Sequence, residues 1–137
     1  MSYWRLHYHL IWATHQREPL LTEAVERQVF GTILNKAKEL GCLVHAIGGV
    51  DDHIHLGISI PPKLAVAQVI RQLKGASAYY VNHQPNAPGT FHWQKGYGAL
   101  TFGERSMETI VAYVRGQKEH HAQNTTIALY EQIESDE

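Results

Sequence analysis

The chain has 137 residues, which is the size of a single ordinary domain. Its 12 Lys and Arg and 13 Asp and Glu give a formal net charge of -1, which argues against a protein that coats nucleic acid by charge alone but permits a local basic face. The single cysteine cannot form an internal disulfide, and the sequence has no apolar run long enough to cross a bilayer. We therefore expect one cytoplasmic domain over residues 1–137, with no membrane partner and with an acidic, frayed tail over about 125–137.

Hydrophobic periodicity predicts a chain of alternating strands and helices. Period-two alternation and short apolar runs indicate the strands, whereas apolar residues that recur every three or four positions indicate the helices. In chain order, the expected elements are a strand over 3–14, a helix from Thr22 to Gly41, strands over 42–50 and 53–60, a helix over 63–83, short strand segments within 91–103, and a helix from Ser106 to about Ala122. This order is typical of an α+β fold with a ferredoxin-like or RRM-like antiparallel sheet and helices packed mainly on one face.

Local signals mark where several of these elements begin and end. Thr22 and Ser106 are residues of the type that caps a helix N-terminus, and Gly41 is of the type that ends a helix. The glycines and aspartates within residues 48–52 predict a tight antiparallel hairpin between the second and third strands.

The segment VDDHIHLGISI, residues 50–60, contains two histidines on a predicted strand. Because His53 and His55 are two residues apart, both imidazoles project from the same face of that strand. Imidazole is a common ligand of transition metals, so the pair can hold one cation. The alternative is that both residues occupy the solvent-facing side of a half-exposed strand. His7 and His9 have the same spacing, so at least one of the two pairs can be structural.

The last predicted helix carries a second group of polar residues, in the segment YVRGQKEHH. Tyr113 and Gln117 are four residues apart and therefore share one helix face. A tyrosine hydroxyl, with an ordinary pKa of about 10, becomes a nucleophile when a nearby cation favours the phenolate. Gln117 offers an amide oxygen as a neutral ligand, and His120 and His121 are further donors. The alternative for Tyr113 alone is a core residue of an amphipathic helix.

The order and spacing of these motifs resemble the single-tyrosine HUH transposases of small bacterial insertion sequences, including the REP-associated tyrosine transposases. The resemblance covers nearly the whole chain and rests on the segments DDHIHLGI, IRQLKGASA, WQKGYGALTFGERS and YVRGQKEHH. It implies metal-dependent cleavage and rejoining of single-stranded DNA at element ends. In that chemistry His53, His55 and Gln117 hold Mg2+ or Mn2+, and Tyr113 forms a 5′-phosphotyrosine intermediate. The resemblance also implies recognition of DNA hairpins by a homodimer, in which the tyrosine helix of one subunit can complete the site of the other.

Basic residues outside these motifs are candidates for contacts with DNA phosphates. They are Arg71, Lys74, Lys95 and Arg115. A solvated helix charge is an equally good interpretation of each of them. Asp51, on the same predicted face as His53, is a candidate to orient an imidazole.

Two other functions stay open at this stage. A domesticated or inactive relative would bind nucleic acid without metal dependence or covalent capture of the strand. A zinc hydrolase would use the same histidine pair with an activated water, but it would need a third strong ligand and a carboxylate base.

Overall fold

The computed structural model describes residues 2–134, which form a four-stranded antiparallel sheet and four helices. The strands are β1 (His7–Ala13), β2 (Leu43–Gly49), β3 (His53–Ser59) and β4 (Gly98–Phe102). The helices are α1 (Glu23–Glu39), α2 (Val66–Asn82), α3 (Met107–Arg115) and α4 (Gln117–Gln123), joined by the short 3-10 turns η1 (His15–Arg17), η2 (Glu104–Ser106) and η3 (Ala128–Glu131). In the sheet the strand order is β2-β3-β1-β4, so β3 and β1 are the central strands.

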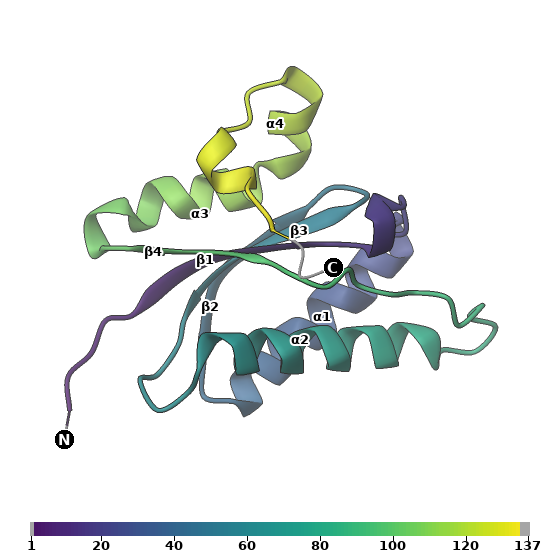
Figure 1. Ribbon diagram of the computed structural model, residues 1–137, viewed down its shortest axis with the longest axis horizontal. Helices are drawn as coiled ribbons and strands as arrows, with labels where there is room; N and C mark the ends of the chain where they lie inside the picture. Colours follow the sequence, from purple (N-terminus) through teal and green to yellow (C-terminus); the bar gives the residue numbers. More distant parts are fainter. Residues whose placement is uncertain (1, 135–137) are drawn as a thin grey trace.

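The helices form layers on both sides of this sheet (Figure 1). The two long helices, α1 and α2, cover one face, and α3 and α4 lie on the other. The elements from β1 to β4 follow the β-α-β-β-α-β order of ferredoxin-like folds. The expected α+β class, an antiparallel sheet with helices packed on it, is confirmed, and α3 and α4 cover the second face as well.

The main core lies between the sheet and the two long helices. Alternation along β3 turns Ile54, Leu56 and Ile58 toward this side, where they are fully buried. They pack with apolar residues that recur at helical spacing, which include Val29, Ile33 and Ala37 of α1 and Val69, Ile70 and Leu73 of α2.

The predicted ends of the first helix agree with the structure. Thr22 caps α1 through its side-chain oxygen, which accepts from the backbone N–H of Val25 at 3.3 Å. Gly41 follows the helix with a φ of 81°, a left-handed conformation that favours glycine.

The last predicted helix differs from its expected form because it is interrupted at Gly116. This residue, with φ -90° and ψ 19°, separates α3 from α4. Helix α3 packs directly on β2, where a Cβ atom at Gly48 would lie 1.9 Å from the carbonyl oxygen of Val114. The close approach of helix and strand therefore requires glycine at position 48. Within the described residues no helix combines the length and apolar character that a bilayer-spanning segment requires.

Candidate active site

The paired histidines of β3 lie on the sheet face that α3 and α4 cover. His53 and His55 point to the same side, as predicted, and their ring centroids are 5.2 Å apart. Both side chains are buried, at 1% and 0% relative exposure. They are not the solvated residues of a half-exposed strand, because helices cover this face as well.

His53 is oriented by the turn that precedes its strand. Its Nδ1 lies 2.7 Å from Oδ1 of Asp52, whose other oxygen accepts from Nε of Arg17 at 3.2 Å. A carboxylate can only accept, so Nδ1 of His53 carries the proton and Nε2 faces the site. The prediction that Asp51 has this role is wrong, because β3 begins at His53 and strand alternation does not extend into the turn. The backbone carbonyl of Asp51 instead accepts from Leu21.

His55 is held by a histidine of the neighbouring strand. Its Nδ1 lies 2.8 Å from Nε2 of His9, and the two rings are stacked with centroids 5.0 Å apart. Burial, and then the charge of His55, lower the pKa of His9 to about 4, so His9 is neutral at pH 7. His7, the other member of the HYH motif, lies 2.6 Å from Ser59 and 2.6 Å from Glu104. His7 and His9 therefore do not form a second metal-binding pair. His7 contacts Ser59 and Glu104, whereas His9 supports His55 of the β3 pair.

Helix α3 places Tyr113 beside the histidine pair of the same chain. The ring centroids of Tyr113 and His55 are 5.7 Å apart, and His120 stacks on the tyrosine at 4.7 Å. The hydroxyl donates to Glu131 and accepts from the backbone N–H of Ile127 at 3.0 Å. Burial, and then the hydrogen bond to Glu131, raise the pKa of Tyr113 to about 12. The tyrosine is therefore protonated in this conformation.

Gln117 lies one turn after Tyr113 and faces the same way, although the helix is interrupted between them. Its side-chain N–H donates to the backbone carbonyl of Tyr113 at 2.9 Å. This contact fixes the amide so that its oxygen lies 3.1 Å from Nε2 of His121. The amide oxygen thus borders the histidine cluster, and Gln117 is fully buried.

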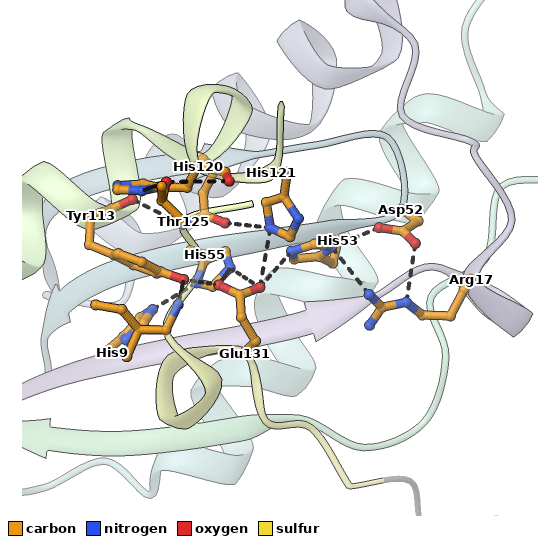
Figure 2. A network of polar contacts seen from close by, with 12 residues as sticks. His9, Arg17, Asp52, His53, His55, Tyr113, His120, His121, Thr125 and Glu131 are labelled. Atoms are coloured by element: carbon orange, nitrogen blue, oxygen red, sulfur yellow. Dashed lines mark hydrogen bonds and ion pairs between the residues drawn. The ribbon is translucent and has the colours of Figure 1, made fainter. Parts of the chain in front are cut away.

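Glu131, which the sequence patterns do not identify, lies at the centre of these groups (Figure 2). Its Oε1 is 3.1 Å from Nε2 of His53, 3.2 Å from Nε2 of His55 and 3.3 Å from Nε2 of His121. Burial alone would raise the pKa of Glu131, but the close contacts with the imidazoles of His53 and His55 outweigh burial and hold that pKa well below its ordinary value. One ligand atom from each of the four residues lies within 4.8 Å of the others. Three imidazoles and a carboxylate fit a divalent transition metal.

Glu131 reaches the site because the chain folds back after α4. Asn124, with φ 55°, ends that helix in the left-handed conformation, and η3 then brings Glu131 over the sheet. Tyr130 packs beside it, 5.3 Å from the ring of His9. These residues belong to the tail that we expected to fray, and residues 135–137 of that tail lie outside the described residues. Neither periodicity nor a motif marks Glu131 as a site residue.

The basic candidates do not gather at this site. Arg71 and Lys74 belong to α2, on the opposite face of the sheet. Nζ of Lys74 donates to the backbone carbonyls of Gln94 and Gly96, at 2.9 and 2.8 Å. Lys95 is exposed in the loop before β4, and the guanidinium of Arg115 donates to the backbone of β2 at 3.3 Å. The basic side chain that does adjoin the histidine pair is Arg17, which no sequence pattern indicated.

Known proteins with similar sequences are transposases. The chain is 29% identical over 119 residues to the ISDra2 transposase TnpA of Deinococcus radiodurans, across 83% of this chain and 85% of that protein. It is 26% identical over 133 residues to the transposase for insertion sequence element IS200 of Salmonella typhimurium, across 92% of this chain and 86% of that protein.

Two solved structures share the fold. A transposase from Deinococcus radiodurans R1 has a TM-score of 0.65 and 26% identity, over 90% of this chain and 94% of that chain. A REP-associated tyrosine transposase bound to a REP hairpin has a TM-score of 0.60 and 15% identity, over 83% of this chain and 70% of that chain.

The family match covers the residues that form the histidine pair and the tyrosine helix. The family model described as Transposase IS200 like matches residues 2–117, so it includes His53, His55, Tyr113 and Gln117. The match ends before His121 and Glu131. The chain therefore belongs to the IS200-like transposase family, as the sequence motifs had indicated.

Proposed function

We propose that this transposase cleaves and rejoins single-stranded DNA at insertion-sequence ends through a 5′-phosphotyrosine on Tyr113. One observation carries the proposal: the Tyr113 hydroxyl and Nε2 of both His53 and His55 converge on the two oxygens of one carboxylate, that of Glu131. A nucleophile and two metal ligands at one point are the parts that metal-assisted phosphoryl transfer requires.

In this proposal His53, His55 and Gln117 hold Mg2+ or Mn2+. When bound, the cation polarises a phosphate oxygen and favours the phenolate over the phenol. Asp52 and His9 fix both imidazoles at Nδ1, so that Nε2 of each is directed to the site. Because imidazole suits transition metals better than Mg2+, we expect Mn2+ to bind more tightly.

The reaction conserves the number of phosphoester bonds. The phenol oxygen of Tyr113 attacks the scissile phosphorus, the bond from phosphorus to the 3′ oxygen breaks, and that oxygen leaves as a 3′ hydroxyl with the proton that the tyrosine gives up. Rejoining is the reverse step with another 3′ hydroxyl, and it restores the tyrosine. No nucleotide hydrolysis is needed because the ester to Tyr113 replaces the ester that was broken.

The proposed substrate is single-stranded DNA with a hairpin near the cleavage site. The REP-associated relative of the same fold is bound to a REP hairpin, which supports a hairpin ligand here. Arg71, Lys74, Lys95 and Arg115 remain the proposed DNA contacts, and their spread over two faces of the sheet suits a strand that passes around the domain. A homodimer is also part of the proposal, and exchange of tyrosine helices between its subunits is the alternative to the arrangement of this chain, in which Tyr113 lies beside its own His55.

The test compares the wild-type chain with Tyr113→Phe. Each is incubated with Mn2+ and an oligonucleotide that carries an element-end hairpin, and the products are separated on a denaturing gel. We expect a shifted protein–DNA band for the wild type and none for Tyr113→Phe, while both chains bind the hairpin equally in a filter or mobility assay. An adduct that persists in Tyr113→Phe would remove Tyr113 from the mechanism.

One observation favours a second candidate, a domesticated or inactive relative that binds nucleic acid without cutting it. Tyr113 is only 4% exposed, and residues 127–131 cover its hydroxyl. Hairpin binding by the wild type, with no adduct in either Mg2+ or Mn2+, would identify this function.

A further inference from the structure

Three imidazoles converge on the carboxylate of Glu131. One carboxylate oxygen, Oε1, lies within 3.3 Å of three imidazole nitrogens. The other, Oε2, accepts from the Tyr113 hydroxyl and also lies 3.2 Å from Nε2 of His55. This convergence of one oxygen and three nitrogens, rather than a row of separate pairs, is visible in Figure 2.

The contact between His53 and Asp52 directs the site-facing nitrogen of His53. Because the Asp52 carboxylate accepts from Nδ1 at 2.7 Å, Nε2 is the ring nitrogen that faces Oε1 of Glu131, at 3.1 Å. Nε2 of His55 faces the same oxygen at 3.2 Å. An imidazole nitrogen from each histidine and one carboxylate oxygen are therefore placed where a single cation can be shared among them.

The distances from Oε1 to the three nitrogens suit such a cation. Neighbouring ligand atoms at about 2.1 Å from an octahedral cation such as Mg2+ or Mn2+ are separated from one another by about 3.0 Å. The distances from Oε1 to the three nitrogens, 3.1, 3.2 and 3.3 Å, are close to that separation. Ordinary hydrogen bonds from charged donors are shorter, at about 2.8 Å.

We propose that Glu131 is a ligand of the same cation as His53 and His55, so that the metal holds the C-terminal segment, residues 125–132, closed over Tyr113. His121 supplies a fourth donor in this closed state. The inference rests on the proposed function, because it concerns the same metal site. It adds a carboxylate ligand that lies outside the residues matched by the family model.

Closure by Glu131 has a consequence for the substrate. A phosphate oxygen and the Glu131 carboxylate are both anionic oxygen ligands, and they require the same position beside Tyr113. The scissile phosphate therefore replaces Glu131 when DNA enters, and the C-terminal segment moves away from the tyrosine.

The first experiment measures Mn2+ binding to the full chain without DNA, from the free Mn2+ signal in electron paramagnetic resonance. We expect Glu131→Ala to raise the Kd at least about tenfold, as the loss of a metal-site residue does. Glu134→Ala, which removes an exposed carboxylate three residues away, is the matched control and keeps the wild-type Kd. A wild-type Kd for Glu131→Ala would overturn the proposal.

A second measurement needs no variant and so does not depend on how Glu131→Ala folds. The backbone N–H of Ile127 donates to the Tyr113 hydroxyl only while the segment is closed. We expect Mn2+ to slow hydrogen exchange in the peptide that covers residues 125–131 of the wild-type chain. Exchange that is the same with and without Mn2+ would also overturn the proposal.

The outcomes separate this inference from the proposed function. If Glu131→Ala binds Mn2+ as the wild type does, and the wild type forms the Tyr113 adduct, the function stands and the ligand assignment fails. If Glu131→Ala loses Mn2+ affinity while no chain forms an adduct, the ligand assignment stands and the function fails.

Discussion

Each imidazole of the histidine pair depends on a different partner at Nδ1. Asp52 fixes His53 by a charged contact at 2.7 Å, and His9 fixes His55 by a neutral contact at 2.8 Å. Only the first contact joins the pair to an exposed basic side chain, because Asp52 also pairs with Arg17. Residues outside the histidine pair therefore determine how His53 and His55 present Nε2 to the site.

Asp52→Asn tests this dependence at the residue scale. An amide at position 52 can donate where the carboxylate only accepts, so His53 loses its fixed tautomer. We expect both Mn2+ affinity and the rate of adduct formation to fall about tenfold or more. Asp51→Asn is the matched control, since Asp51 contacts its neighbours through its backbone carbonyl. Equal losses in both variants would show that Asp52 acts only through the stability of the turn.

At the scale of elements, the position of Tyr113 depends on how α3 sits on β2. The carbonyl of Val114, the residue after the tyrosine, lies where a side chain at position 48 would begin. Ile110 and Val114 pack with Ala46 of β2. These apolar contacts and Gly48 together determine the distance between α3 and the sheet. The proposed nucleophile, Tyr113, is therefore positioned by a strand that carries none of the proposed metal ligands.

Gly48→Ala should displace α3 and with it Tyr113. A methyl group 1.9 Å from a backbone oxygen cannot be accommodated without movement. We expect a loss of about 1–3 kcal/mol in the free energy of unfolding, as overpacking costs, and a slower rate of adduct formation. Gly31→Ala in α1, where a Cβ meets nothing within 4 Å, should instead gain about 0.5–1 kcal/mol and keep the rate. Denaturant unfolding and the gel assay measure both effects, and an unchanged rate in Gly48→Ala would contradict this account of α3.

Element by element, prediction from the sequence succeeds where a local signal decides the structure. The cap at Thr22 and the alternation around His53 and His55 are local, and the structure agrees with both. The break at Gly116 is not predicted, because Tyr113 and Gln117 on its two sides keep the four-residue spacing of one continuous helix. The turn that brings Glu131 back depends on a left-handed Asn124 and on packing of Tyr130 against the covered face, which are tertiary effects.

At the scale of the whole molecule, one chain contains the histidine pair and the tyrosine at the same site. The family resemblance identifies the residues but leaves open whether they meet within a subunit or between two. In the structure Tyr113 lies beside His55 of its own chain, at 5.7 Å between ring centroids. The sequence alone does not show which of the two arrangements occurs, because the packing of α3 on β2 that places Tyr113 is a tertiary contact.

Mixing two inactive variants tests this arrangement. Tyr113→Phe lacks the nucleophile and His55→Ala lacks a metal ligand, so a site complete within each chain stays inactive in the mixture. We expect no adduct when the two variants are combined and incubated with hairpin DNA and Mn2+. An adduct in the mixture would show that subunits exchange their tyrosine helices.

The order of the sheet gives the two halves of the site unequal rigidity. The strands that carry His9, His53 and His55 are the central ones, with hydrogen-bonded neighbours on both sides. Tyr113 and Glu131 instead stand on peripheral elements that can separate from the sheet without breaking its ladders. Partial unfolding that frees Tyr113 would thus leave the imidazoles of His53 and His55 in place, so two of the proposed metal ligands stay arranged while the peripheral elements move.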